Sequence, residues 1–223
     1  MNSDDGPLPI FPLANVVLFP HVQAPLQLFE PRYRQLAKHV LDGSRRIGMV
    51  VVVPEHVAEM AGDPPVFPVG CAGVITRAQE LSDGRYNLVL LGTHRFRIVR
   101  ELERSEERLY RVAEVERLVD AFEAADSERV DALRSSVLGL VRDLLEGREP
   151  ERARRLTPDL LRNLEAAKLV NALSNAFALP AQEKQGLLEA DSIPERFERL
   201  STVLRFLLAE RFAGAPANPG TLH

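Results

Sequence analysis

The stretch LFPHVQAPLQLFEPRYRQL, residues 18–36, places apolar side chains between three prolines. Proline has no N–H to donate to a strand ladder and cannot occupy a helix interior, so this spacing is typical of short elements separated by turns. We expect the prolines to confine NVVLF (residues 15–19) and LQLF (residues 26–29) to short strands. Pro31 then suits the first position of a helix, where its missing N–H would be unpaired anyway. The stretch therefore predicts strand, turn, strand and helix in succession.

A β-rich pattern continues from this helix to about residue 118. We expect the helix over residues 31–42, since apolar side chains recur at helical spacing and Gly43 follows where a glycine stop is common. RIGMVVVV (residues 46–53) is typical of a strand buried on both faces. The Asp-Gly pair in SDGR (residues 82–85) predicts a tight hairpin, and LYRVAEVERL (residues 109–118) predicts a last strand.

Within the predicted hairpin, Gly92 would permit a bend or a bulge. Arg95 and Arg97 flank Phe96 further along, a pattern also found on basic–aromatic surfaces that bind nucleic acids. Alternation along a half-exposed strand explains these arginines more simply.

From about residue 121 the apolar period becomes that of helices. Ser192 and Glu195 have the S-x-x-E spacing of a capping box. The predicted helical segments are SERVDALRSSVLGLVRDLLEG (127–147), TPDLLRNLEAAKLVNALSNAF (157–177, starting at Thr157), LPAQEKQGLLEA (179–190) and DSIPERFERLSTVLRFLLAERF (191–212). We therefore expect an α+β protein, with one helix inserted among the strands and a separate helical bundle after them.

The expected division of the chain follows from this change of period. It comprises a disordered start (1–7), a β-rich half (8–118), an α-helical bundle (119–213) and a disordered tail (214–223).

Composition limits the classes of function. The formal net charge is −4, so a nucleic-acid partner is not expected, because proteins of that class carry a basic excess or a basic face. A single cysteine, Cys71, suits a reducing compartment, and the first residues do not form a secretory signal. The longest aliphatic run is too short to cross a membrane. We expect a cytoplasmic protein without a membrane partner.

Motifs for catalysis are absent from the sequence. It contains no G-x-x-x-x-G-K-[ST], no H-E-x-x-H and no G-x-S-x-G, and its five histidines are scattered. We therefore predict no catalytic residue, no metal ligand and no cofactor.

Two blocks carry a resemblance to a known family. LPIFPLANVVLFPHVQAPLQLFEPRYRQL (8–36) and VGCAGVITRAQELSDGRYNLVLLGTHRFRI (69–98) resemble conserved blocks of the N-terminal, substrate-binding domain of Lon proteases. The resemblance implies a PUA-like β-barrel or pseudobarrel followed by a helical bundle. His21 departs from the family, which usually has glycine after Phe-Pro. If the turn needs φ > 0, histidine is less comfortable there than glycine.

The resemblance also implies a function. It indicates a module that engages unfolded or tagged polypeptides, as an adaptor or a chaperone-like protein, with a protease or ATPase as partner. The ATPase module and the serine–lysine protease module of Lon have no counterpart in these 223 residues. We therefore expect a non-enzymatic protein, with neither proteolysis nor ATP hydrolysis.

The candidate contact residues lie near the proline-rich opening, where exposed apolar side chains could receive an extended segment. Arg32 is the candidate anchor for a carboxylate or a carbonyl. The full set is Phe19, Val22, Leu26, Leu28, Phe29 and Arg32. Phe19, Leu28 and Phe29 could equally belong to a buried core. Arg32 could equally be a solvated residue at the helix start or an internal partner of a nearby acid.

Three alternatives stay open at this level. A PUA-like shape could bind RNA, which would show as strongly salt-dependent binding. A cleft between the two halves could bind a small molecule or hold a hydrolytic site, which would show as a cluster of titratable residues there. The helical half could form a homo-oligomer through the stripe Val203, Phe206, Leu207 and Phe212, which equally fits packing inside the bundle.

Overall fold

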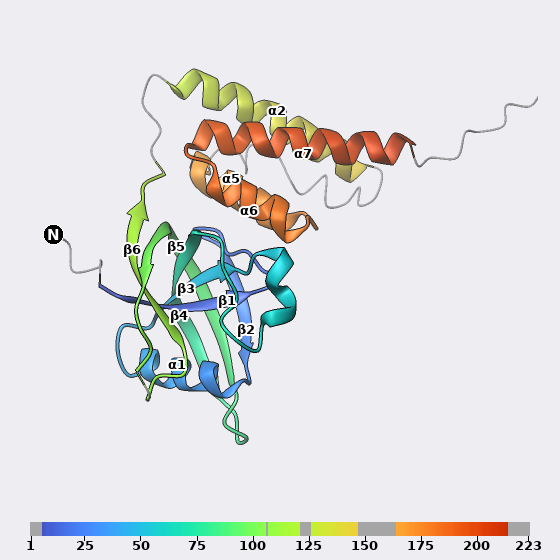
Figure 1. Cartoon of the computed structure of the whole chain (residues 1–223). Helices are drawn as coiled ribbons and strands as arrows, with labels where there is room; N and C mark the ends of the chain where they lie inside the picture. Colours follow the sequence, from blue (N-terminus) through green and yellow to red (C-terminus); the bar gives the residue numbers. More distant parts are fainter. Residues whose placement is uncertain (1–5, 106, 121–125, 147–163, 214–223) are drawn as a thin grey trace, which may run out of the picture. The chain divides into compact units, whose positions relative to one another are not determined.

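The computed structural model describes residues 6–105, 107–120, 126–146 and 164–213 (Figure 1). The chain separates into two compact units. The β-rich unit comprises Met1–Asp120 together with Asn171–Glu189, and the helical unit comprises Ala121–Val170 together with Ala190–His223. Strands and helices are both present, as the sequence predicts for an α+β protein.

A six-stranded mixed sheet, in the order β2-β5-β4-β3-β1-β6, forms the β-rich unit. Its strands are β1 (Leu8–Leu13), β2 (Gln23–Leu28), β3 (Arg46–Val51), β4 (Val69–Glu80), β5 (Tyr86–Glu101) and β6 (Arg111–Leu118). The pairing of β1 with β3 is parallel, and the other pairings are antiparallel. The long strand β5 pairs with β2 through its first half and with β6 through its second half.

The first strand differs from the prediction. NVVLF (residues 15–19) is not a strand, whereas LPIFPL forms β1 despite its two prolines. Residues 8–10 of β1 pair with β6 and residues 10–13 pair with β3. Pro9 and Pro12 therefore each have a partner strand on one side only, and the missing N–H needs no acceptor on the other side. The position of the first strand is therefore decided by its pairing partners, which the β-propensity of its residues does not reveal.

The helix α1 (Pro31–Leu41) agrees with the predicted helix to within a residue, and it buries Tyr33, Leu36, Ala37 and Val40. Its end differs from the prediction, because Gly43 does not take a positive φ. The left-handed residue is Arg45, with φ 56°, and its N–H donates to the carbonyl of Val40 over 2.8 Å. The turn after α1 therefore closes two residues later than a glycine stop would close it.

The predicted hairpin between β4 and β5 is present, and Gly84 at its turn has φ 78°. The expected irregularity near Gly92 is also present, as a register shift between β4 and β5. Phe96 on β5 is fully buried in a cluster with Leu8, Ile10, Val50, Ala72 and Ala113. A Cβ at Gly70 would lie 2.6 Å from the Phe96 ring, so the ring fits only because the neighbouring strand has no side chain there.

Arg95 does not lie on the exposed side of β5, contrary to what alternation along a half-exposed strand predicts. Its side chain is only 2% exposed. Its Nε donates to Asp120 Oδ1 over 2.6 Å, and its Nη1 donates to the Leu188 carbonyl over 2.9 Å. Arg97, two residues further on, is exposed as predicted. The alternation of β5 is therefore interrupted by a buried guanidinium whose charge is paired.

The short helix α6 (Ala181–Glu189), confirmed where the sequence predicts it, packs in the β-rich unit. In addition to the Arg95 contact, the Gln185 side-chain amide donates to the carbonyl of Val69 on β4 over 2.9 Å. Residues 171–189 therefore group with the strands, whereas the sequence-based division, which stays a prediction, groups them with the other helices.

The helical unit contains α2 (Ser127–Glu146), α7 (Ile193–Ala213) and the first residues of α5 (Ala166–Ala176). Figure 1 shows α2 running alongside α7. Ser192 and Glu195 cap the start of α7 much as predicted: the Glu195 N–H donates to Ser192 Oγ, while Glu195 Oε2 accepts from the N–H of Asp191, one residue before the cap residue of a standard capping box. The predicted helix start at Thr157 lies outside the described residues.

Candidate functional site

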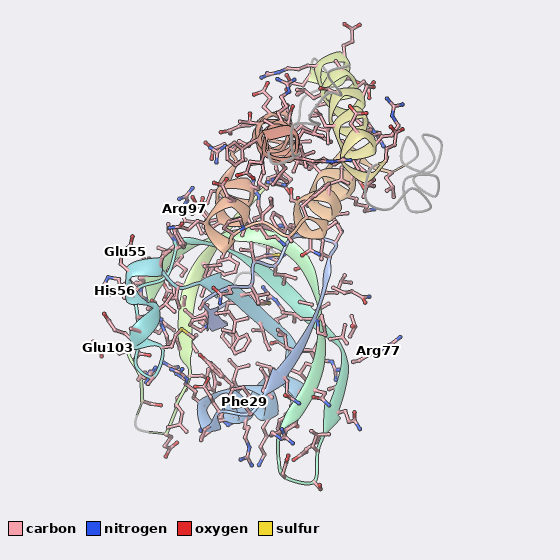
Figure 2. All side chains as sticks on the ribbon, turned by 90° about the vertical axis from the view of Figure 1, so that its right-hand side faces the viewer. Phe29, Glu55, His56, Arg77, Arg97 and Glu103 are labelled. Carbon is pink, nitrogen blue, oxygen red and sulfur yellow. The ribbon has the colours of Figure 1, made fainter. Side chains whose placement is uncertain are left out.

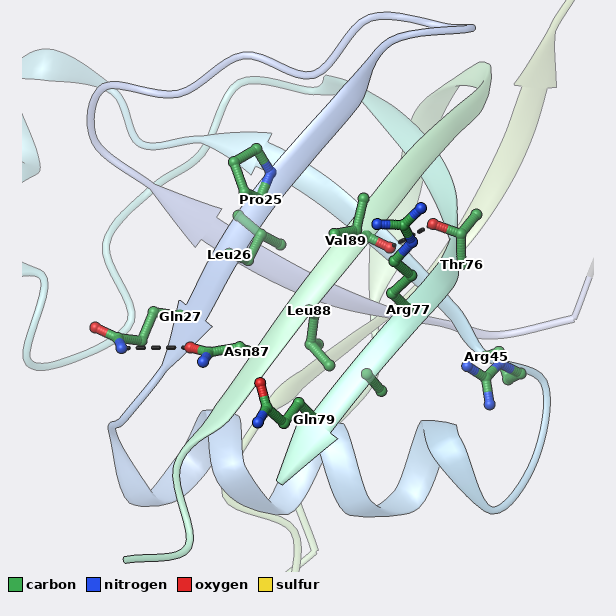
Figure 3. Close-up of a pocket in the computed structure, with 11 residues that line it drawn as sticks. Pro25, Leu26, Gln27, Arg45, Thr76, Arg77, Gln79, Asn87, Leu88 and Val89 are labelled. Atoms are coloured by element: carbon green, nitrogen blue, oxygen red, sulfur yellow. Dashed lines mark hydrogen bonds between the residues drawn. The ribbon is translucent and has the colours of Figure 1, made fainter. Parts of the chain in front are cut away.

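An open groove crosses the outer face of β2, β5 and β4, with a volume of about 870 Å³ (Figure 3). We call it the β2–β5–β4 groove. Its lining residues are Pro25, Leu26, Gln27, Arg45, Thr76, Arg77, Ala78, Gln79, Asn87, Leu88 and Val89. All of them belong to the β-rich unit.

The alternation of β5 builds the centre of this groove. Tyr86, Leu88 and Leu90 are buried, whereas Asn87 and Val89 face outward and are half-buried. Pairing then sets residues side by side across the three strands, because directly opposed residues in antiparallel strands point to the same face. One row places Val89 between Pro25 and Arg77. The groove therefore has apolar contacts at its centre, close to a cation.

A second row of the groove consists of amide side chains. Asn87 lies between Gln27 on β2 and Gln79 on β4 in the strand register. The Gln27 Nε2 donates to Asn87 Oδ1 over 3.3 Å (Figure 3). Amides have both donors and acceptors, so groups left over from this contact can bind a polypeptide backbone. This row gives the groove a polar end that is uncharged.

The two charged residues of the groove are both arginines, and no acidic residue lines it. Arg45 donates through Nε to the carbonyl of Ile75 over 3.2 Å. Arg77 is exposed, and its side chain makes no hydrogen bond or ion pair in the part of the chain that the structure describes. The groove thus carries positive charge in a chain whose formal net charge is −4.

Tyr86 borders the amide row and stays protonated at neutral pH. Burial raises the pKa of its hydroxyl, and a side-chain hydrogen bond with Glu80 acts in the same direction. The hydroxyl therefore contributes no charge to this end of the groove.

The predicted contact residues are placed in very different environments. Phe19 and Leu28 are 0% and 1% exposed and belong to the core, so they do not offer a surface to a ligand. Val22 is half-buried. Leu26 lines the groove, and Phe29, labelled in Figure 2, is 60% exposed directly after β2. Phe29 is thus the predicted apolar residue that stays exposed, whereas Leu26, like Val22, is half-buried and lies opposite the buried Leu88 in the strand register.

Arg32 is occupied by contacts within the β-rich unit. Its Nε donates to Glu30 Oε2 over 3.0 Å, and its two terminal nitrogens donate to the carbonyls of Gly62 and Met60 over 2.8 and 2.5 Å. The guanidinium also lies 4.6 Å from the centre of the Tyr33 ring. These contacts agree with the alternative reading of Arg32 as an internal partner, and they attach the segment around residues 60–62 to the start of α1.

Sequence reasoning missed Arg45, Arg77, Gln79 and Asn87 as residues of one surface. The Asp-Gly hairpin signal and the alternation of residues 86–90 contained part of the information, because together they predict that Asn87 and Val89 share a face with residues on β4. The register shift of β4 between Ile75 and Arg77 was not visible in the sequence, and it decides that Arg77 lies opposite Val89.

The described residues show neither a metal centre nor a membrane span. Within 6–105, 107–120, 126–146 and 164–213, no group of three or more histidine, cysteine or acidic side chains could hold a metal ion. None of the helices described there has the length and apolar character required to cross a membrane.

Comparison with solved structures defines the class of fold. The chain is similar to a Lon N-terminal domain protein from Xanthomonas campestris, with a TM-score of 0.58, 24% identity, and coverage of 90% of this chain and 98% of that one. It is also similar to the N-terminal domain of the Mycobacterium avium complex Lon protease, with a TM-score of 0.67, 17% identity and the same coverage. The fold is thus that of Lon N-terminal domains.

Sequence comparison places the chain in a family. Residues 7–205 match the model of the substrate-binding domain of ATP-dependent protease La (LON), and the chain belongs to this family. It is 30% identical over 206 residues to the Lon protease of Cytophaga hutchinsonii, and 28% identical over 199 residues to that of Flavobacterium johnsoniae. Each match covers 88% of this chain. The chain spans about a quarter of the length of these relatives, 24% in both cases.

Proposed function

We propose that the chain is a non-enzymatic polypeptide-binding module, and that the β2–β5–β4 groove receives an extended segment of an unfolded or tagged protein. The observation that carries the proposal is an open groove with an apolar centre and an amide row, on a domain of the Lon substrate-binding family. Apolar side chains of the segment would lie on Pro25 and Val89, while its peptide groups reach the amides.

The position of β2 supports an extended ligand. Within the described sheet β2 is the edge strand, since its pairing partner is β5 alone. An extended segment lying over β2 can therefore continue past the edge without meeting another strand of this sheet. Pro25 removes one backbone donor from β2, which limits uncontrolled strand addition at this edge. The side-chain surface, rather than the strand edge, then provides the main contact.

The proposed site keeps Leu26 and Phe29 from the sequence-based set. Phe29 would extend the apolar surface beyond the end of β2, because its side chain is 60% exposed. Val22 would contribute at most a half-buried edge. Phe19, Leu28 and Arg32 would act indirectly, by fixing the core and the start of α1.

The wider role proposed here is that of an adaptor or chaperone-like protein in the cytoplasm, which delivers polypeptides to a protease or an ATPase. The relatives named above are Lon proteases, and this chain matches about a quarter of their length. The finer prediction of a PUA-like barrel belongs to the same proposal. Its support is the pairing of β1 with β3, β3 with β4, β4 with β5, β5 with β6 and β6 with β1.

Fluorescence anisotropy of labelled, chemically unfolded casein against the purified chain tests the proposal. A folded protein of similar size and labelled RNA serve as comparison ligands. We expect saturable binding to the unfolded chain only. Replacing Val89 in the groove by serine (Val89→Ser) should weaken this binding about fivefold, because it removes apolar contact area.

Val99→Ser is the matched control, since Val99 is a valine of the same strand that is 63% exposed and does not line the groove. Both variants lose β-propensity equally, so a difference between them reports the groove. If the two substitutions had equal effects on binding, the polypeptide-binding site would not lie in the groove. Lack of binding by the unsubstituted chain would contradict the proposed function itself.

A further inference from the structure

The charge of the β2–β5–β4 groove is unusual for this protein. Acidic residues outnumber basic ones in the chain, 32 to 28. The groove nevertheless has two arginines and no acidic residue among its lining residues. A surface intended only for apolar segments gains nothing from two guanidinium groups, since desolvating a cation costs free energy unless the ligand pairs with it.

Several other arginines of the β-rich unit have internal carboxylate partners. Arg85 pairs with Asp83 over 2.7 Å, and Arg100 pairs with Glu114 across the β5–β6 ladder. Arg104 and Arg111 likewise pair with Asp63 and Glu101. Arg77 differs from them, because no carboxylate contacts it in the ranges that the structure describes.

Strand register places Arg77 within the groove rather than at its margin. Arg77 lies directly opposite Val89, one row away from the amide row of Gln79 and Asn87. Figure 3 shows its side chain close to Val89 and Thr76, with Arg45 further along the groove. A carboxylate bound by Arg77 would therefore have apolar surface on one side and amides on the other. Arg77 would therefore contact a residue in the middle of a bound extended segment rather than at its end.

We propose that the groove selects extended segments that carry an aspartate or glutamate side chain next to apolar residues. This inference rests on the proposed function and specifies its substrate class. The guanidinium of Arg77 pairs with the acidic side chain, and Pro25 and Val89 cover the apolar neighbours. Arg45 adds positive potential along the groove. An internal acidic residue fits better than a terminal carboxylate, because the segment continues past Arg77 in both directions.

Two labelled peptides test the inference directly. They share one extended apolar sequence and differ at a central position, which is glutamate in one and glutamine in the other. By anisotropy at low salt, we expect the chain to bind the glutamate peptide about fivefold more tightly, as for an exposed but well-placed ion pair. The net charge of −4 acts against this preference, so non-specific attraction cannot produce it.

Arg77→Gln should abolish the preference while leaving binding of the glutamine peptide nearly unchanged. Arg97→Gln is the matched control, since Arg97 is another exposed arginine of the same sheet and does not line the groove. Figure 2 shows the two arginines on opposite sides of the β-rich unit. Val89→Glu gives a second variant: its carboxylate lies opposite Arg77 in the register, so it should weaken binding of the glutamate peptide more than Val89→Gln does.

The outcomes separate the inference from the function on which it rests. Equal affinity for the two peptides, or the same loss of preference in Arg97→Gln, overturns the inference while the polypeptide-binding function stands. Binding of neither peptide overturns both. Single-stranded RNA could displace the glutamate peptide from the unsubstituted chain but fail to bind the Arg77→Gln variant. Arg77 would then be a phosphate-binding residue, and the inference would also be overturned.

Discussion

Replacing His21 by glycine should make the protein more stable. His21 has φ 66°, a left-handed conformation that costs a residue with a Cβ about 1–2 kcal/mol. Hydrogen bonds fix this conformation: the His21 N–H donates to the Gly92 carbonyl over 2.8 Å, and the Gly92 N–H donates to the Val22 carbonyl over 2.9 Å. A change to negative φ would break the first of them. The imidazole is exposed, so its removal sacrifices little packing.

The expected magnitude follows from two opposed effects. Glycine removes the left-handed penalty of about 1–2 kcal/mol, but it increases the entropy of the unfolded chain by an amount worth about 0.5–1 kcal/mol. The free energy of unfolding should therefore rise by about 0.5–1 kcal/mol. For a protein of this size that corresponds to an increase of about 1–4 °C in the melting temperature.

Urea denaturation and calorimetry of His21→Gly measure this change. His21→Ala is the control, because alanine removes the imidazole and keeps the Cβ that causes the penalty. We expect His21→Ala to be no more stable than the original chain. If the alanine variant gained as much stability as the glycine variant, relief of backbone strain would not be the cause. A loss of stability in His21→Gly would refute the reasoning altogether.

Three further predictions concern stability. Arg95→Ala should lower the free energy of unfolding by about 3 kcal/mol in urea denaturation, because it removes the hydrogen bonds to the Leu188 carbonyl and to Asp120 from a buried position; a loss below 1 kcal/mol would contradict this. Gly70→Ala should cost about 1–3 kcal/mol by the same assay, since the added Cβ would lie 2.5 Å from the Met49 carbonyl oxygen, whereas Gly139→Ala, with open space around it, should not destabilise. Burial raises the pKa of Glu195, but the Asp191 N–H and Arg199 outweigh it, so the folded pKa lies below its ordinary value. The resulting stability is present above about pH 4.3 and is lost as the pH falls through the folded pKa, so the unfolding free energy of Glu195→Gln should vary less with pH in acid.

Local signals were sufficient for many elements of the fold. Pro31 and the apolar stripe after it predict α1, and the Asp-Gly pair predicts the β4–β5 hairpin, because both depend on residues close together in the sequence. The buried run RIGMVVVV predicts β3 for the same reason. The capping box of α7 is similarly local, since its partners are separated by three or four residues.

Features that depend on distant partners were not predicted. β1 forms because residues of β3 and β6 pair with it. The local sequence LPIFPL does not indicate which strands will be its partners. The burial of Arg95 depends on Asp120 and Leu188, which lie 25 and 93 residues away in the chain. Arg45 occupies the left-handed position after α1 although a glycine lies two residues earlier, so composition alone indicated the wrong residue.

The candidate site was predicted only in part. The sequence indicated the segment around residues 19–32, and of the apolar residues chosen there Phe29 is exposed, while Val22 and Leu26 are half-buried. Phe19 and Leu28 were indistinguishable from them, because apolar residues of core and contact surface have the same chemistry. Strand register, which the sequence does not give, brings Arg77 and Asn87 to the same surface.

The discontinuity of the β-rich unit has a consequence for synthesis of the chain on the ribosome. Its strands end at Leu118, but the Leu188 carbonyl that pairs with Arg95 and the Gln185 amide that caps the Val69 carbonyl are translated much later. The 69 residues from 121 to 189 take on the order of 3–14 s to translate at about 5–20 residues per second. During that interval the nascent sheet lacks α6 and its polar contacts. A chain that ends near residue 120 would stay permanently in this incomplete state, so the β-rich unit requires residues 171–189 to be translated before its folding is complete.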